Sequence, residues 1–242
     1  MATRIRTTYR TLADIKSIPL PERTDSYTPV DQASFFKEAC DRFEFRGYTL
    51  NNETHMVHRK HPIFISKIDV YGPDLPNDGR MKWTVAMMNS YNKTIANRII
   101  FGGTVYVCTN GVIVADHVLR TKHTAHVWDR LPKMIDDAVA AFGYQVNKAN
   151  EFYEDLKKVN TSTEQLASFA VDLGRKGLLH KPQVIDFYEE CVKPSFDYQT
   201  PDLCLWNLHA AYTHLAKTLN PVERPQRVLG FEKALSAHYA NA

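Results

Sequence analysis

The order of hydrophobic and polar positions along the chain predicts one early helix, then strands, then only helices. Residues 31–43 (DQASFFKEACDRF) carry apolar side chains at three- and four-residue intervals, which is the spacing of a helix with one buried face. Residues 63–70 and 81–90 show the two-residue alternation of strands instead. In the second of these runs Trp83, Val85 and Met87 point one way, and Lys82, Thr84 and Ala86 point the other.

Two asparagine pairs predict hairpin turns between strands. Asn51-Asn52 separates two short apolar runs, and asparagine tolerates the left-handed conformation of a tight turn. Asn110-Gly111 is the strongest hairpin signal in the chain, because it stands between alternating residues 104–109 and a return run at 112–114. Gly102-Gly103 permits a bend or bulge just before it.

After Asp129 the pattern becomes helical. Apolar residues recur at helical spacing from Leu131 to Leu156, which predicts one long amphipathic helix to about Val159, with Pro132 in its first turn. A capping box is expected at Thr161 and Glu164. Prolines predict the starts of three further helices: Pro182, Pro201 and Pro225.

These elements predict an α+β fold, because the strands come together and the helices follow them. An antiparallel or mixed sheet is expected over about residues 46–116, packed with helices and followed by a helical C-terminal third. The expected domains are an extended basic arm at 1–28, an α+β core at 29–160 and a helical bundle at 161–242 that packs on the core. The arm is basic through Arg4, Arg6 and Arg10, and its prolines are expected to interrupt regular structure.

Composition narrows the class of protein. Hydrophobic residues make up 44% and charged residues 24% of the 242 residues, which is typical of a folded chain. No apolar run has the length of a membrane span and the N-terminus lacks a secretory signal, so we expect the cytoplasm. The four cysteines form no C-x-x-C pair and are expected to be buried free thiols.

Positive charge is concentrated in residues 80–130. This stretch holds seven Lys and Arg against two Asp, a net charge of +5, although the whole chain carries only +3. Lysine and arginine side chains can contact phosphates, and aromatic rings can stack on unpaired bases, so a stretch that contains both favours nucleic-acid binding. The candidate residues are Lys82, Tyr91, Lys93, Arg98, Phe101, Tyr106, Arg120 and Lys122. In the alternative interpretation the aromatic residues belong to the core and the cations form a solvated rim.

Histidines suggest a second kind of site. Asp116 and His117 end a predicted strand, and His123 and His126 share a helical face if a helix begins near Thr121, so a metal ion is one hypothesis for these four residues. Surface histidines in a basic region are the alternative. Cys108 beside histidines is a candidate nucleophile, but a buried strand cysteine is the favoured interpretation. No phosphate-binding glycine motif is present, and the sequence predicts no cofactor.

Several segments resemble a phage- and plasmid-borne protein family known only as a domain of unknown function. The matching segments are Asn89-Ser90-Tyr91-Asn92, Val107-Cys108-Thr109-Asn110-Gly111, residues 120–124 and residues 205–213. The sharpest is the V-C-x-N-G motif at 107–111, and the resemblance spans about residues 28–220. Lys93 stands where the family often has glycine. The resemblance implies a mobile-element origin, most simply a bacteriophage, and it implies no catalytic residue.

Three hypotheses follow. The leading one is a non-enzymatic phage protein that binds nucleic acid, in particular single-stranded DNA, in replication, recombination or annealing, and that forms homo-oligomers. The second is a phage interaction protein that inhibits or redirects a host enzyme or defence component. The third is a metal-dependent enzyme that uses Asp116, His117, His123 and His126.

Overall fold

A computed structural model describes residues 7–58, 61–76, 81–105, 110–195, 200, 202–219 and 224–240. Within these ranges the side chains of 7, 104–105, 110–117 and 224–225 are not described. The chain forms two compact units. One comprises Met1–Pro76, Lys82–Gly103 and Asp116–Asn147, and the other comprises Asn77–Met81, Thr104–Ala115 and Lys148–Ala242. The division falls inside a helix at residue 147, whereas the sequence placed a domain boundary after residue 160.

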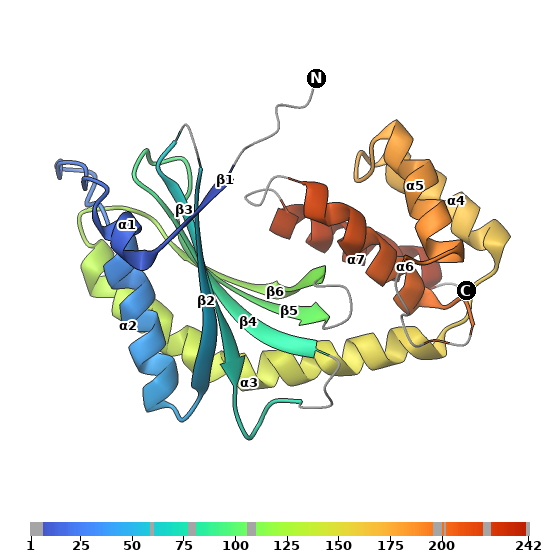
Figure 1. Ribbon diagram of the computed structural model, residues 1–242, viewed down its shortest axis with the longest axis horizontal. Helices are drawn as coiled ribbons and strands as arrows, with labels where there is room; N and C mark the ends of the chain where they lie inside the picture. The colour runs from blue at the N-terminus through green and yellow to red at the C-terminus, as the bar shows by residue number, and fades with distance from the viewer. Residues whose placement is uncertain are drawn as a thin grey trace. The chain divides into compact units, whose positions relative to one another are not determined.

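The strands form one six-stranded antiparallel sheet in the order β1-β2-β3-β4-β5-β6, so neighbours in sequence are neighbours in space (Figure 1). Their bounds are Thr7–Arg10, Thr49–His58, Ile63–Tyr71, Met81–Ser90, Asn97–Val105 and Asn110–Thr121. Helices follow the sheet, and the C-terminal region is helical. The predicted α+β class with an antiparallel sheet is therefore confirmed.

The segment expected to be an extended arm contains regular structure. Thr7–Arg10 is strand β1, which pairs with the second half of β2 through Thr7↔His58 and Arg10↔His55. The short helix α1 (Leu12–Lys16) follows, capped by the side chain of Thr11. The prolines do not interrupt these elements because both end before Pro19.

The hairpin predicted at Asn51-Asn52 is wrong. Strand β2 continues through both residues, and the register with β3 shifts between Asn51 and Thr54. Asn52 does adopt the left-handed conformation (φ 55°), and its side-chain amide donates to Asp69 Oδ2 at 3.0 Å. The asparagine signal therefore marks a β-bulge, where one strand takes up an extra residue without turning back.

The hairpin predicted at Asn110-Gly111 is also displaced. Both residues belong to strand β6, and the connection from β5 to β6 comprises residues 106–109, which lie outside the described residues. Gly102 and Gly103 lie within β5. Cys108 and the first part of the V-C-T-N-G motif therefore also lie outside the described residues.

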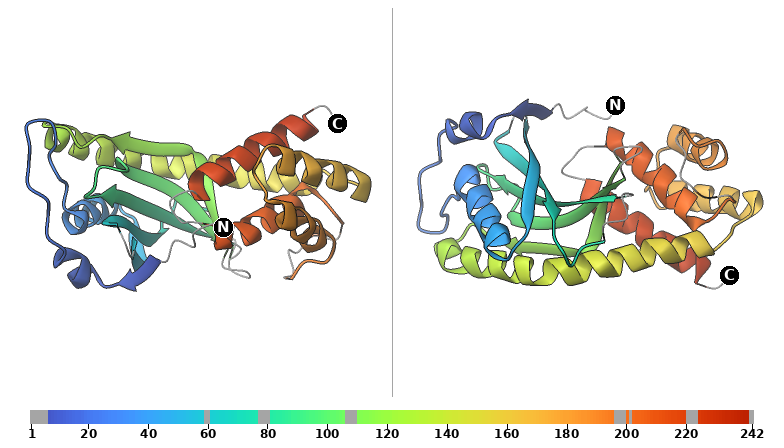
Figure 2. Two further views of the ribbon diagram at one scale, coloured as in Figure 1. Left: turned by 90° about the horizontal axis from the view of Figure 1, so that it is seen from above. Right: turned by 60° about the horizontal axis from the view of Figure 1, so that its bottom comes forward.

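One face of the sheet is covered by α2 (Gln32–Phe45) and the first half of α3 (Val127–Lys158), as Figure 2 shows. The contact is aromatic. Phe142 of α3 meets Phe43 of α2 at 5.2 Å between ring centroids and meets Phe101 of β5 at 5.0 Å, both edge to face. Edge-to-face pairs add to the stabilisation that burial of such rings provides.

Helix α3 begins at Val127, four residues earlier than expected, so that Pro132 lies inside the helix beyond its first turn. Its first part belongs to one compact unit and its last part, from Lys148, to the other. The apolar spacing predicted the length of this helix correctly to within a few residues. Among the described residues, no helix is long and apolar enough to cross a membrane.

The second unit consists mainly of the end of α3 and four more helices: α4 (Thr163–Arg175), α5 (Lys181–Val192), α6 (Leu205–Leu215) and α7 (Arg224–Tyr239). The capping box of α4 lies one residue later than predicted, between Ser162 and Gln165. Phe169, Phe187 and Phe231 from three of these helices pack together in the interior. The free thiols Cys191 and Cys204 are buried here, in agreement with the expectation from the sequence, whereas the free thiol Cys40 on α2 is only half-buried.

Candidate nucleic-acid interface

Two segments of the basic stretch meet in the first compact unit. The turn between β4 and β5 (residues 91–96) is joined to the segment after β6 by His123, whose Nε2 lies 3.2 Å from the carbonyl oxygen of Ile95. The amide of Asn97 donates to the carbonyl oxygen of Thr121 at 3.5 Å. These contacts between residues far apart in sequence fix the position of the cations in both turns.

Tyr91 does not lie on this surface. It is 5% exposed, and its hydroxyl donates to Asp31 Oδ1 at 3.3 Å while it accepts from the backbone N–H of Gln32 at 3.2 Å. Burial raises the pKa of this hydroxyl to about 12. A ring held in this way has no free face for a base, so the prediction that Tyr91 stacks on nucleic acid does not fit this structure.

Phe101 is fully buried against Phe142, so it too has no ring face to offer to a base. The two-residue alternation in β5 indicates a strand, but it does not specify which face of the sheet the helices cover. Tyr106, the third predicted stacking residue, lies outside the described residues. For Tyr91 and Phe101 the alternative interpretation, that the aromatic residues belong to the core, is correct.

Two of the predicted cations have aromatic or acidic neighbours. Lys82 Nζ lies 3.9 Å from Asp69 Oδ2, and its side chain is 30% exposed. Lys93 is exposed in the β4–β5 turn, and its Nζ lies 4.4 Å from the ring centroid of Tyr27. Lys93 also has a left-handed backbone (φ 66°), a conformation that is unfavourable for a side chain of this type. Of the two, Lys93 is the one that remains available to an anion.

Arg98 on β5 is close enough to Arg120 on β6 for the two positive charges to interact. Arg98 is half-buried, and burial together with the charge of Arg120 lowers its pKa. Its Nε is buried and has no hydrogen-bond partner among the described residues. Arg120 and the nearby Lys122 are exposed. Two like charges with an unfilled donor create a site that an anion such as a phosphate would stabilise.

The predicted metal ligands are not brought together as far as the structure describes them. His123 is buried and bonds to a backbone carbonyl, whereas His126 is exposed with its Nδ1 3.1 Å from Asp129 Oδ2. The side chains of Asp116 and His117 lie outside the described residues. No group of three or more His, Cys, Asp or Glu among the described residues is arranged to hold a metal ion.

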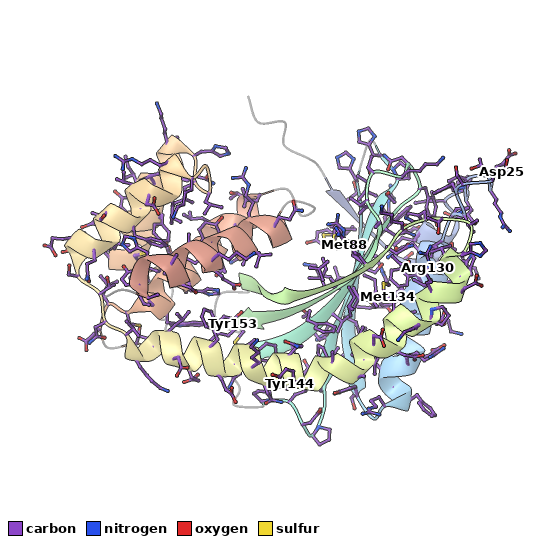
Figure 3. The ribbon with its side chains drawn as sticks, turned by 180° about the vertical axis from the view of Figure 1, so that it is seen from behind. Asp25, Met88, Arg130, Met134, Tyr144 and Tyr153 are labelled. Carbon is purple, nitrogen blue, oxygen red and sulfur yellow. The ribbon has the colours of Figure 1, made fainter. Side chains whose placement is uncertain are left out.

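Sequence reasoning missed Trp128 and Arg130 in the first turn of α3. Trp128 is 42% exposed. The Arg130 guanidinium bonds to the hydroxyl of Thr124 and to the carbonyl oxygen of His126, and Figure 3 shows Arg130 at the start of α3. Arg130 was counted in the basic stretch, but the helix start predicted at Leu131 placed both residues outside the helix. The signal that could have identified them is that they follow Lys122 within the same basic stretch.

A buried polar network beneath α2 was also missed. His55 Nδ1 lies 2.9 Å from Ser66 Oγ, and the Gln32 amide donates to the same hydroxyl at 2.9 Å. Glu53 lies on the other side of the imidazole, with its Oε1 3.7 Å from Nε2. The order of groups resembles a hydrolase triad, but Ser66 is fully buried and therefore inaccessible to a substrate. The network joins α2 to β2 and β3.

A comparison with protein families gives one match. Residues 19–181 match a model described as a domain of unknown function, DUF932. The match covers most of the first compact unit, including all the cations described above. Neither the curated proteins nor the solved structures contain a match to this chain.

Proposed function

This chain belongs to the DUF932 family, and we propose that it binds single-stranded DNA without acting as an enzyme. The observation that carries the proposal is the pair Arg98 and Arg120, two neighbouring cations of which one has a buried donor without a partner. The family description supplies no activity. The proposal includes a bacteriophage origin, a role in replication, recombination or annealing, and self-association, as the sequence resemblance and the charge distribution suggest.

The physical argument is one of charge neutralisation. Holding a half-buried guanidinium group close to a second, exposed one is unfavourable unless an anion joins them. Phosphate groups do this well, because arginine presents a planar set of donors that matches phosphate oxygens. Exposed Lys93 and Lys122 extend the positive surface on either side of the contact between His123 and Ile95. A row of cations of this kind is suited to a phosphate backbone rather than to a single small anion.

The test is fluorescence anisotropy of a labelled oligodeoxythymidylate at low and moderate salt. We expect the wild type to bind and the double variant Arg120→Ala, Lys122→Ala to bind at least tenfold more weakly, because two exposed phosphate contacts are lost. The matched control is Lys133→Ala, Lys176→Ala, which removes two exposed cations that are paired with Asp137 and Asp172. Equal weakening in both variants would show that only net charge matters, and absence of wild-type binding at low salt would refute the proposal.

One observation favours a second function, interaction with a partner protein such as a host enzyme. Phe45 at the end of α2 is 92% exposed, and it lines a groove of about 640 Å³ between α2 and α3 together with Val139 and Ala140. A large exposed aromatic residue beside a groove is typical of protein-binding surfaces. Capture of one stoichiometric host protein by the wild type and its loss in Phe45→Ala would establish this function. Unchanged capture would exclude the groove.

A further inference from the structure

Trp128 is the most exposed tryptophan of the chain. It is 42% exposed, whereas Trp83 and Trp206 are 2% and 5% exposed. An indole ring loses favourable burial when it stays in water, so such exposure often indicates a binding role. The sequence suggested three aromatic residues for base stacking, of which two are buried. Trp128 is an exposed ring in the same basic stretch.

The backbone around Trp128 is held in place. The turn before α3 is closed by hydrogen bonds from Thr124 N to Lys122 O at 2.9 Å and from Val127 N to Thr124 O at 3.0 Å. Arg130 bonds back to the same turn. Lys122 and Trp128 are therefore attached to the two ends of one fixed turn. A rigid ring loses little conformational entropy when it binds a ligand.

The local charge also suits a nucleic acid. Asp129, which follows Trp128 in sequence, is paired with His126 across 3.1 Å. Arg120 and Lys122, both exposed, precede the turn on the strand side. Proteins that bind single strands combine aromatic rings, on which bases stack, with cations that contact the phosphates between them.

We propose that Trp128 stacks on an unpaired base while Lys122 and Arg120 contact the neighbouring phosphates. This inference rests on the proposed function and makes it more specific, because stacking requires a base that is not already stacked in a duplex. Trp128 is then the residue that selects single strands. The cations attract the phosphates of single-stranded and duplex DNA alike.

The wild-type protein reports on this contact through its own fluorescence. Trp83 and Trp206 are buried, so quenching of tryptophan emission by oligodeoxythymidylate arises mainly from Trp128. We expect quenching that follows the anisotropy titration. In Trp128→Phe the quenching should disappear while most of the affinity remains, because a phenyl ring still stacks. Retention of full quenching in this variant would contradict a contact at Trp128.

Affinity measurements test the selectivity. Trp128→Ala should bind oligodeoxythymidylate about five- to one-hundred-fold more weakly, the range for loss of one stacked base. Its affinity for a duplex of equal length should stay within about twofold, because the phosphate contacts remain. Tyr144→Ala, which removes an exposed aromatic ring from α3, is the matched control and should leave both affinities unchanged. Circular dichroism verifies that each variant is folded.

The two proposals fail in different ways. Wild-type binding that Trp128→Ala leaves unchanged would overturn the stacking role and keep the cationic site. Equal loss of single-strand and duplex affinity would also overturn the role in selection, since a stacking contact should affect the two differently. Failure of the wild type to bind any nucleic acid at low salt would overturn both proposals.

Discussion

Lysine is an uncommon residue type for the left-handed backbone conformation found at position 93. At φ 66° a side chain with a Cβ is strained by about 1 kcal/mol, and glycine is not. The ammonium group offsets part of this cost through its contact with the ring of Tyr27, which is worth about 0.5–1 kcal/mol at an exposed position. The presence of lysine at such a position is more easily explained by ligand binding than by stability.

Two substitutions of Lys93 separate the backbone strain from the contact with the ring of Tyr27. Lys93→Ala keeps the strain and loses the ring contact, so its free energy of unfolding should fall by about 0.5–1 kcal/mol. Lys93→Gly removes the strain as well and should be about 1 kcal/mol more stable than the alanine variant. Urea unfolding measures both. If lysine contacts phosphate, the two variants should bind DNA equally weakly despite their different stabilities.

The buried histidines make stability depend on pH. Burial lowers the pKa of His55, with Glu53 opposing the shift, and it lowers that of His123, with the carbonyl oxygens of Ile95 and Thr28 opposing. The unfolded chain therefore binds these protons at a higher pH than the folded chain does. Stability contributed by the neutral rings is fully present above the ordinary pKa of 6.5 and decreases as the pH falls below it.

Urea unfolding at pH 7.5 and pH 5.5 checks this prediction, with the wild type less stable at the lower pH. In His55→Asn the amide takes the place of Nδ1 beside Ser66, and the difference between the two pH values should become smaller. His126→Gln, at an exposed position, serves as the control and should keep the wild-type difference. A wild type that is equally stable at both values would show that neither buried ring is kept neutral by the fold.

Single residues also show where the sequence was insufficient. Tyr91 and Phe101 were chosen as stacking residues because they are aromatic and lie among cations, and both are buried. The choice failed because burial depends on which face of the sheet α2 and α3 cover, and local alternation does not specify that. Trp128 was missed for the complementary reason, since its exposure depends on where α3 begins.

At the scale of elements, Tyr48 is the link between the end of β3 and the first half of α3. Its hydroxyl donates to Asp74 Oδ2 at 3.0 Å, and its ring packs against Phe43 and Phe142. Gly72 lies against the ring itself, where an added Cβ would come within 2.5 Å of Cδ1. At Gly143 the nearest atom to an added Cβ is instead Asp74 Oδ2, which accepts the Tyr48 hydroxyl, and that hydroxyl lies 3.1 Å from the added Cβ. The exposed Asp74 carboxylate can move aside, but only by giving up this hydrogen bond.

This difference gives expectations of different size for two glycine substitutions. Gly72→Ala should lower the free energy of unfolding by about 1–3 kcal/mol, because the ring of Tyr48 cannot move without disturbing its aromatic neighbours. Gly143→Ala should lower it by less than about 1 kcal/mol, because the helix preference of alanine, about 1 kcal/mol, offsets most of the lost hydrogen bond between Tyr48 and Asp74. Thermal or urea unfolding of the pair is the measurement. Similar losses in both would mean that the ring of Tyr48 limits the packing no more than its hydrogen bond to Asp74 does.

The elements themselves were largely predictable, and their connections were not. The apolar spacing identified α2, β3, β4 and α3 because each buries one face over many residues. Asn52 was correctly expected to adopt a left-handed backbone conformation. A β-bulge and a hairpin turn can both place a residue in this conformation, so the residue type alone does not distinguish them. What distinguishes them is whether β3 continues to pair on both sides, which is a property of two strands and is not visible in either alone.

At the scale of the whole molecule, the charge distribution was the most useful quantity in the sequence. The net charge of +5 over residues 80–130 includes Lys93, Arg98, Arg120 and Lys122, all of which lie in the first compact unit. The structure adds what the count lacked, namely that Arg98 and Arg120 are close enough to repel each other. The pairing of β1 with β2 was not predictable, because the interaction joins Thr7 to His58 across a long stretch of intervening chain.

Salt dependence tests whether these cations act together on one nucleic acid. Each phosphate contact to a single strand changes the slope of log K against log salt by about −0.7, because a condensed counterion is released. Four contacts, from Lys93, Arg98, Arg120 and Lys122, predict a slope of about −3, and Arg120→Ala with Lys122→Ala should reduce its magnitude by about half. A slope near zero would mean that binding does not depend on phosphates. A steep slope that the double variant leaves unchanged would place the contacts elsewhere on the chain, because counterion release depends only on which cations touch the backbone.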